Sequence, residues 1–325
     1  MSINKFRQQE SKNMRVSGTK YLLSLSLALG LSACATTTDT STTAVDPVQA
    51  VAKTTMPDDA DPAIWVLKDE DTTIYLFGTV HILKPGLTWF DEAVRDAFDA
   101  SDELVVEMIS PDPTEMVKIV NRLAIDKTGI ALRDKLTAED RAKYEAALVS
   151  LELPVESFDA LDPWFASINI SLIPLMKGGY KTDSGVESDL KAVAETRKMK
   201  IVGLETPEQQ LGFFDGLPEE VQIEFLNFTV ETLGDMTDGM ENMVAEWANA
   251  NVDALGELMN AGLEDKVLYD TLLANRNATW ADWVDERMDQ PGTVFIAVGA
   301  GHLAGESSLQ QMLKDKNIVA QRILY

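Results

Sequence analysis

A strand-like run of apolar residues, "TIYLFGTV" at residues 73–80, is followed by a helix-like segment and then by a second strand-like run. Apolar side chains recur every three or four positions in residues 89–100, which places them on one face of a helix. Residues 102–108, "DELVVEM", are again typical of a strand. A strand, a helix and a strand within about 35 residues indicate a parallel pair of strands.

The same order occurs at the C-terminal end, with a strand-like run at residues 293–300, a helix-like segment at 307–316 and a strand-like run at 318–324. Helical spacing dominates between the two units, apart from a predicted strand at residues 200–206. We therefore predict an α/β fold with a mixed, partly parallel central sheet built from both ends of the domain. A long, mainly helical insertion covers about residues 111–290, and an α+β fold is the alternative.

Local signals divide this insertion into separate helices. "TAED" at residues 137–140 is a capping sequence that opens a helix. Residues 163–179 are an apolar helix that ends at two consecutive glycines. Residues 207–288 have the pattern of further helices, with a turn at "DGLP", residues 215–218.

Residues 1–33 are typical of a bacterial lipoprotein signal peptide. Basic residues precede a short apolar run that is too short to span a membrane. Small residues precede Cys34, so we predict that Cys34 is lipidated after cleavage; a plain signal peptide with a chance cysteine is the alternative. Residues 34–60 are polar and rich in threonine, which predicts a disordered tether. The folded part is then a single domain at residues 61–325.

Charge and cysteine content limit the partners and the location. The chain has 28 Lys and Arg against 53 Asp and Glu, a net charge of −25, which opposes nonspecific binding to nucleic acid or to anionic membranes. The single cysteine leaves no thiol for a disulfide once it is lipidated. We expect a protein of the bacterial envelope, held in the outer membrane by its N-terminal lipid alone and facing the periplasm. The oligomeric state stays open.

The carboxyl ends of four predicted strands hold residues that are suited to chemistry. Ligands bind at these ends in parallel α/β sheets, so side chains located there converge. The chain contains two histidines, and each follows a strand-end glycine by three positions, which permits a sharp turn and a close approach to a ligand. In chain order, the residues are Gly78 and His81, Glu107, Glu205, and Gly299 and His302.

Two neutral imidazoles and a carboxylate are a usual ligand set for a catalytic divalent cation such as zinc, manganese or iron. Such a cation lowers the pKa of its bound water, and a remaining carboxylate can act as a general base. The alternative is that His81 and His302 are hydrogen-bonded structural residues. Glu107 and Glu205 would then be solvated strand ends, or Glu205 would cap the helix that begins near Pro207.

Motifs of other hydrolases and of nucleotide sites are absent from the sequence. There is no G-x-S-x-G, no H-E-x-x-H, no P-loop and no G-x-G-x-x-G. A serine triad that uses Ser184 or Ser307 stays open, although nothing near these serines favours it.

Five blocks of the sequence, taken together in their order, resemble the TraB/PrgY/GumN family, which is related to the Tiki metalloproteases and, more distantly, to erythromycin-esterase-like and ChaN-like proteins. The resemblance covers nearly all of residues 61–325. The blocks are "AIWVLKDEDTTIYLFGTVHIL", "ELVVEM", "IVGLETPEQQLGFFDGLP", "NRNATWADWV" and "VFIAVGAGHLAGESSLQQML".

The resemblance implies a ligand set for a metal. The paired G-x-x-H motifs fall on His81 and His302, and the family glutamate after the second strand falls on Glu107. The Tiki-like relatives imply a metal-dependent peptidase, with manganese or cobalt favoured over zinc or iron. Two departures concern the substrate side: Glu187 stands where the family commonly has aspartate, and "GESS" at residues 305–308 replaces an acid followed by glycine.

Three further residues fall on family-typical positions, namely Glu205, Arg276 and Asn277. Our first hypothesis is a metal-dependent hydrolase, a peptidase, in which Glu205 or a metal-bound water is the base. Arg276 and Asn277 would orient the substrate, with a structural salt bridge as the alternative role of Arg276. The second hypothesis is a non-catalytic envelope lipoprotein that binds iron, haem or a peptide signal in the same cleft. The third is an interaction protein with vestigial histidines.

Overall fold

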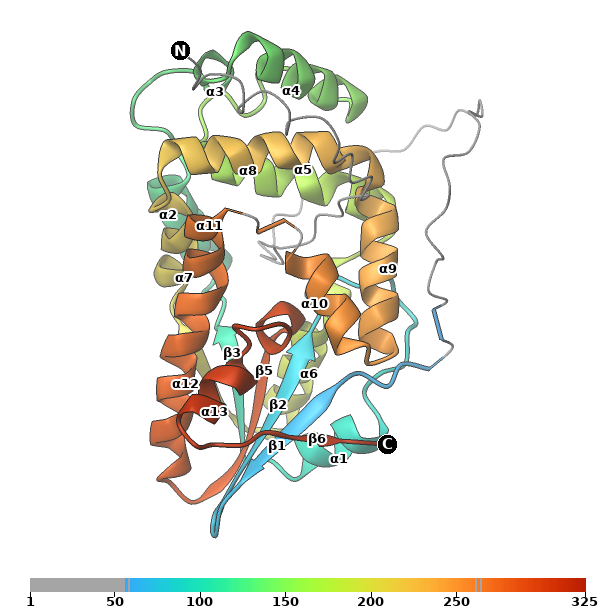
Figure 1. The fold of residues 1–325 in the computed structure, drawn as a ribbon. Helices are drawn as coiled ribbons and strands as arrows, with labels where there is room; N and C mark the ends of the chain where they lie inside the picture. The colour runs from blue at the N-terminus through green and yellow to red at the C-terminus, as the bar shows by residue number, and fades with distance from the viewer. Residues whose placement is uncertain (1–55, 58, 261, 264) are drawn as a thin grey trace, which may run out of the picture.

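Six strands form one mixed sheet in the structure, a computed structural model that describes residues 56–325 apart from 58, 261 and 264 (Figure 1). The strand order is β4–β3–β5–β2–β1–β6. The first four are mutually parallel, and β1 is antiparallel to both β2 and β6. The predicted α/β fold is confirmed. The strands are β1 (Ile64–Lys68), β2 (Thr72–Thr79), β3 (Glu103–Met108), β4 (Lys200–Glu205), β5 (Gly292–Gly299) and β6 (Gln321–Ile323).

The predicted parallel pairs are wrong in one respect, because neither predicted unit forms neighbouring strands. β5 lies between β2 and β3, with Gly78 opposite Val298 and Val294 opposite Glu103. β6 pairs with β1 at the edge of the sheet and is shorter than the predicted strand. The physical reason is burial: β5 is almost entirely apolar and suits the centre of a parallel sheet, whereas β6 is largely polar and suits an edge.

Helices surround the sheet and extend beyond its carboxyl end. In Figure 1, α5 and α8 lie across the top, above the tips of the parallel strands, and α12 and α9 descend on either side. The helices are α1 (Glu92–Asp99), α2 (Pro113–Leu123), α3 (Leu132–Lys135), α4 (Ala138–Ser150), α5 (Pro163–Lys177), α6 (Val186–Arg197), α7 (Pro207–Asp215), α8 (Glu219–Thr232), α9 (Met236–Ala248), α10 (Val252–Asn260), α11 (Lys266–Tyr269), α12 (Asn275–Met288) and α13 (Leu309–Asp315). Short turns are η1 (Thr182–Ser184), η2 (Leu233–Asp235), the π-helical η3 (Asp270–Ala274) and η4 (Ala300–Leu303).

The capping residues predicted from the sequence lie at the ends of helices in the structure. Thr137 is the N-cap of α4, and its hydroxyl accepts a hydrogen bond from the backbone of Asp140 at 3.2 Å. α5 ends at Gly178, and the next glycine has a φ of 91°, a backbone conformation that favours glycine. α7 opens with a capping box between Thr206 and Gln209. The alternative in which Glu205 caps this helix is therefore wrong.

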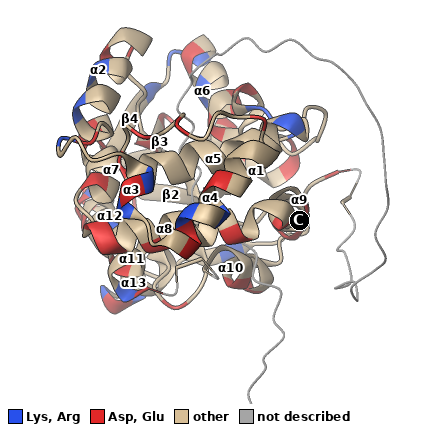
Figure 2. Cartoon of the chain, turned by 90° about the horizontal axis from the view of Figure 1, so that it is seen from above, with Lys and Arg blue, Asp and Glu red and all other residues tan. Residues whose placement is uncertain are grey.

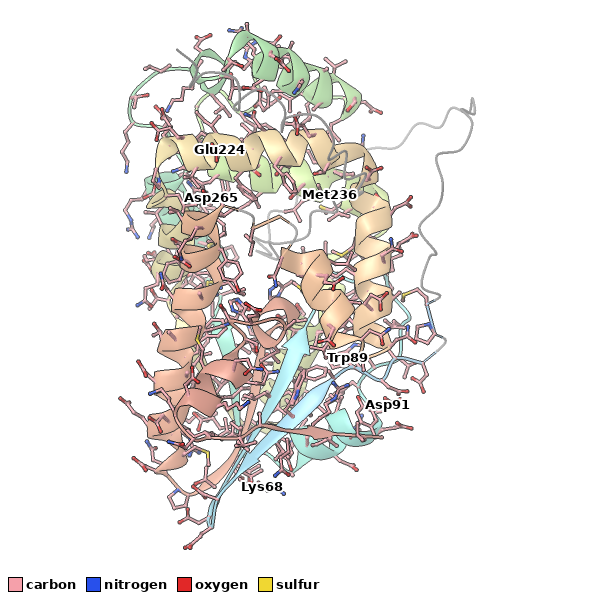
Figure 3. All side chains as sticks on the ribbon, viewed as in Figure 1. Lys68, Trp89, Asp91, Glu224, Met236 and Asp265 are labelled. Carbon is pink, nitrogen blue, oxygen red and sulfur yellow. The ribbon has the colours of Figure 1, made fainter. Side chains whose placement is uncertain are left out.

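Apolar side chains cover both faces of the sheet, as a parallel sheet requires. One face packs against aromatic residues, among them Trp89, which stacks on Phe77 with ring centroids 5.9 Å apart (Figure 3). The opposite face packs against α12 and α13 through residues such as Trp280 and Leu309. Two further apolar clusters join the helices beyond the sheet. The rim of the sheet therefore lies between two packed regions.

The predicted signal peptide, Cys34 and most of the predicted tether lie outside the described residues. In the part of the chain that the structure describes, no helix is both long and apolar enough to cross a membrane. Seen from above in Figure 2, Asp and Glu residues occur on helices all around the molecule, with Lys and Arg interspersed among them.

Asp162, which precedes α5, has an unfavourable charge in the folded protein. Partial burial, together with the neighbouring charges of Asp126 and Asp215, raises the pKa of Asp162 from 3.8 to about 6. The protonated form is thus favoured by folding, so this contribution to stability is fully present below about pH 4 and is lost as the pH rises through 6.

We predict that Asp162→Asn stabilises the protein at pH 7.5 and leaves its stability unchanged at pH 4. A shift of this size corresponds to about 3 kcal/mol for a fully buried group, and solvent screening of this half-exposed carboxyl reduces it to about 1 kcal/mol. Denaturant unfolding at both pH values measures the difference.

Asp96→Asn is the control, because Asp96 is an exposed aspartate on α1 and should show no such pH dependence. An equal effect of Asp162→Asn at both pH values would contradict the assignment.

Candidate functional site

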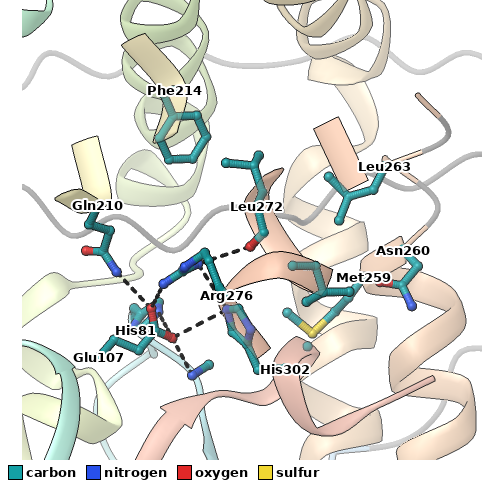
Figure 4. Close-up of a pocket in the computed structure, with 13 residues that line it drawn as sticks. His81, Glu107, Gln210, Phe214, Met259, Asn260, Leu263, Leu272, Arg276 and His302 are labelled. Atoms are coloured by element: carbon teal, nitrogen blue, oxygen red, sulfur yellow. Dashed lines mark hydrogen bonds and ion pairs between the residues drawn. The ribbon is translucent and has the colours of Figure 1, made fainter. Parts of the chain in front are cut away.

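The carboxyl ends of the four parallel strands bring the predicted site residues to one rim (Figure 4). β2 leads into the segment that carries His81, and β5 leads into η4, which carries His302. Glu107 and Glu205 lie at the ends of β3 and β4, where Met108 is opposite Glu205. The convergence expected from the pattern of strands therefore occurs, and α12 adds Arg276 and Asn277 from the side.

Both strand-end glycines are needed for close approach rather than for an unusual backbone conformation. A Cβ added to Gly299 would lie 2.9 Å from Glu107 Oε1 and 3.5 Å from His81 Nε2. The backbone N–H of Gly299 donates to Glu107 Oε1 at 2.6 Å. A Cβ at Gly78 would lie 3.0 Å from the Cα of Ala300. Any larger residue at these positions would push the site apart.

His302 is held in one tautomer by Asn277. The amide nitrogen of Asn277 donates to two backbone carbonyls, of His302 at 3.2 Å and of Ser307 at 2.8 Å. Its amide oxygen must therefore accept from His302 Nδ1, 2.7 Å away. This leaves His302 Nε2 unprotonated, 3.9 Å from Glu107 Oε1. Burial, reinforced by the charge of Arg276, lowers the pKa of His302 to about 3, so the ring is neutral.

His81 is held by Glu187 in the first turn of α6. His81 Nδ1 contacts Glu187 Oε1, which also accepts from the hydroxyl of Thr79, and His81 Nε2 lies 4.0 Å from Glu107 Oε1. Burial, the largest single effect, lowers the pKa of His81, but the charge and hydrogen bond of Glu187 together with the charge of Glu107 outweigh it, so the net pKa is raised. A Cβ at Gly185 would overlap the carbonyl oxygen of His81, so this glycine lets α6 approach.

Glu107 is the centre of the arrangement, and its side chain is 9% exposed. Its Oε2 accepts from Arg276 Nη2 at 2.7 Å and from Gln210 Nε2 at 2.8 Å, while its Oε1 faces both histidines. Burial alone would raise the pKa of Glu107, but Arg276 and the two imidazoles hold it well below the usual range. Glu107 is therefore a permanently ionised carboxylate and a poor general base.

Arg276 joins Glu107 to Glu205. Its guanidinium forms two hydrogen bonds to Glu205, Nε to Oε1 at 2.8 Å and Nη2 to Oε2 at 2.9 Å. Its Nη1 donates to the carbonyl of Leu272 at 3.1 Å and lies 3.1 Å from His302 Nε2. Leu272 belongs to the π-helical turn η3, and irregular turns of this kind often occur at functional sites.

The three residues to which the sequence assigned catalytic roles have different surroundings in the structure. Arg276 lines the cavity, but it also forms the ion pair that was the alternative role for it. Glu205 lies behind Arg276, where burial raises its pKa and Arg276 opposes this rise. Asn277 is fully buried and all its side-chain hydrogen bonds are used. In this structure Asn277 positions His302, and its role in orienting a substrate stays a prediction.

The predicted metal ligands converge without forming a closed site. Among the described residues, no group of three or more His, Cys, Asp or Glu side chains has the spacing of a metal site. Arg276 also donates to the lone pair of His302 that a cation would need. The donor set nevertheless fits a divalent cation: two ring nitrogens face one carboxylate oxygen, and Glu187 and Asn277 hold the opposite nitrogens as outer-shell partners of metal-bound histidines do.

A cavity of about 80 Å³ opens in front of these side chains (Figure 4). One wall is polar, formed by the histidines, Glu107, Gln210 and Arg276, and the opposite wall is apolar. The apolar lining residues are Phe214, Met259, Leu263, Leu272 and Leu273.

Sequence reasoning did not assign a role to Gln210, and it noted Glu187 only as a departure from a family pattern. Gln210 follows β4 by five positions and is brought to Glu107 by the capped start of α7. The capping signal "TPEQ" at residues 206–209 was the clue that α7 begins directly after β4, which keeps Gln210 near the strand ends. For Glu187, the clue was a glycine two positions earlier, which indicates a close approach of two backbones.

Comparison with known proteins agrees with this geometry. The profile of the TraB/PrgY/gumN family matches residues 63–322, which include all four strand ends of the site. The chain belongs to this family. No solved structure matches the chain significantly.

The curated relatives that match the chain are distant in sequence, but each match covers most of both chains. The uncharacterized protein YbaP of Escherichia coli (strain K12) is 23% identical over 253 residues, which are 78% of this chain and 92% of that protein. YbaP of Shigella flexneri gives the same values. An uncharacterized protein of Treponema pallidum (strain Nichols) is 20% identical over 273 residues, 78% of this chain and 81% of that protein.

We predict that Arg276→Met destabilises the protein by about 3–5 kcal/mol, because it leaves two buried carboxylates without their shared cation. The double variant Arg276→Met with Glu205→Gln should recover part of this loss, since one of the two charges is then gone. Denaturant unfolding followed by circular dichroism measures both.

Arg122→Met is the matched control. Arg122 forms an exposed ion pair with Glu208, and its removal should change the free energy of unfolding by less than about 1 kcal/mol. Equal stability losses in the two single variants would rule out a central role for Arg276.

Proposed function

We propose that this protein is a metal-dependent hydrolase that acts on peptides or proteins. The observation that carries the proposal is the pair of imidazoles, each oriented by its own partner, that face a single oxygen of an ionised carboxylate. The cavity in front of this oxygen gives a substrate access to it. Two imidazoles and a carboxylate with open positions are the ligand set of many hydrolytic metal centres.

His81 Nε2, His302 Nε2 and Glu107 Oε1 are the atoms that would hold the cation. Manganese, cobalt, zinc and iron all accept this mixture of nitrogen and oxygen donors. When bound, such a cation lowers the pKa of a coordinated water and so supplies a nucleophile near neutral pH.

The remaining residues prepare the site. Glu187 and Asn277 fix the two imidazole rings. Gln210 and Arg276 hold Glu107 Oε2, which leaves Oε1 directed at the histidines. Arg276 lines the cavity, where its positive charge would stabilise negative charge that develops on a substrate carbonyl. Glu205 keeps Arg276 in place, so a base other than Glu205 is required.

The N-terminal sequence supports a location for this activity. We infer that Cys34 carries the lipid anchor and that the domain faces the periplasm from the outer membrane. The net charge of −25 keeps the domain away from nucleic acid and from anionic lipid, so the lipid would be the sole attachment to the membrane.

A binding protein without catalysis is the second candidate, and one observation favours it. Arg276 is already paired with Glu107 and donates to His302, so these side chains are hydrogen-bonded to one another without a metal. In that case the cavity would hold a peptide signal, or the histidines would bind iron or haem for transport.

Metal content distinguishes the two candidates. We expect purified full-length protein in detergent to bind one equivalent of manganese, cobalt, zinc or iron after incubation with each, measured by elemental analysis and titration calorimetry. His81→Ala and Glu107→Ala should bind at least tenfold more weakly, and Asn277→Ala should lose about 10–100-fold in affinity because an outer-shell partner of a ligand is removed.

Glu195→Ala is the control for Glu107→Ala, because Glu195 is an exposed glutamate on α6 and should keep full metal binding. Failure of the wild type to bind any of the four metals would refute the hydrolase proposal and leave the binding protein.

A further inference from the structure

The site has two arms that meet at three side chains. His81, Glu107 and Gln210 line the cavity described above, and they also line a second cavity of about 350 Å³. The first cavity continues toward α7, α10 and η3, and the second continues toward the end of β3, α2, η1 and α6. We call these the apolar arm and the polar arm. A ligand that lies in both must pass over Glu107.

The apolar arm is built to hold a large hydrocarbon group. Its far wall consists of one aromatic and several aliphatic side chains, of which Phe214, Leu272 and Leu273 are buried in the core. Met259 and Asn260 on α10 form the outer part and are only half-buried. Methionine is flexible and adapts to groups of different shape, so this wall would accept several apolar side chains.

The polar arm has a different chemistry. Its lining includes the hydroxyl-bearing side chains of Ser110, Thr182 and Ser188, beside apolar residues from β3 and α2 such as Met108 and Met116. Lys191 on α6 also lines it and forms no ion pair with any described residue, although acidic residues outnumber basic ones almost two to one in the chain. Two acidic residues of η1 and α6 also line this arm, Asp183 and Glu187, and Glu187 is already paired with His81. Lys191 is therefore a cation available to a ligand.

Gln210 lies where the arms meet and has hydrogen-bonding capacity left. Its amide nitrogen donates to Glu107 Oε2 at 2.8 Å, and its amide oxygen has no partner among the described residues. The residue is 6% exposed, and the hydrogen bond of its amide nitrogen to Glu107 limits the directions in which this oxygen can face. A backbone N–H of an extended peptide that crosses Glu107 would satisfy it.

We propose that the site takes an internal segment of an extended peptide, with a large apolar side chain in the apolar arm and an acidic side chain beside Lys191 in the polar arm. This specificity rests on the proposed function, because it assumes that peptides are the substrates. The two arms require chain on both sides of the bond that is acted on. Peptides that extend to one side only should bind poorly.

Fluorescence anisotropy with labelled peptides tests the proposal on full-length protein without added metal, so that binding is measured apart from cleavage. The reference peptide carries leucine or phenylalanine and, four to six residues away, glutamate. Met259→Gln should weaken binding of this peptide about tenfold. It should not change binding of a peptide in which serine replaces the leucine. Lys191→Gln should weaken binding of the reference peptide several-fold and remove most of the salt dependence of this binding. It should not change binding of a peptide in which glutamine replaces the glutamate.

Two matched controls keep the result specific. Met176→Gln changes an exposed methionine on α5, and Lys198→Gln changes an exposed lysine just after α6; neither should alter binding. Asp183→Asn should strengthen binding of the acidic peptide, because it removes a negative charge from the polar arm. Circular dichroism confirms that each variant is folded.

The outcomes separate this inference from the proposed function. Binding that is lost when either half of the peptide is removed, with no cleavage under any metal, would support the two arms and refute the hydrolase. Cleavage that is insensitive to both variants would support the hydrolase and overturn the two-arm specificity. Peptides truncated on one side that bind as tightly as the full reference, or no peptide binding at all, would also overturn it.

Discussion

The site depends on one arginine between two buried carboxylates. Glu107 and Glu205 end adjacent parallel strands, so the sheet itself brings two negative charges together in a chain that is already strongly acidic. Arg276 binds both with hydrogen bonds of 2.7–2.9 Å. Because buried charges need both pairing and full hydrogen bonding, this geometry is what allows the strands to end in acids at all. It also fixes α12 against the sheet.

The pairing of Arg276 with both carboxylates explains the positions of the residues around it. Once Arg276 and Gln210 hold one oxygen of Glu107, the other can point only toward the histidines and Gly299. Asn277 follows Arg276 in α12 and holds His302 from the opposite side, so a single helix positions both the cation and one imidazole. Glu187 does the same for His81 from α6. The centre is thus assembled from three helices and four strand ends whose relative positions are set by packing.

The sequence was sufficient to predict the four parallel strands and their convergence, because apolar runs with glycine or an acid at their ends are local signals, but β1 was not predicted. It was not sufficient for strand order. The insertion of β5 between β2 and β3 depends on which run is most apolar across the whole sheet, and no local pattern near Gly78 or Glu107 contains that comparison. The surroundings of Glu205 and Asn277 could not be predicted for a similar reason. Whether a polar side chain faces the cavity or lies behind its wall depends on helix packing.

The same arginine decides how the centre responds to a cation. His302 Nε2 has one lone pair, so it either accepts from Arg276 or binds a metal. A hydrogen bond from a charged donor contributes about 1.5–3 kcal/mol, whereas binding of a structural zinc ion contributes on the order of 10 kcal/mol or more. Loss of the Arg276 contact would therefore lower the metal affinity without preventing binding. Arg276 would keep its bonds to Glu107 and Glu205, so the site would gain a cation without leaving an acid unpaired.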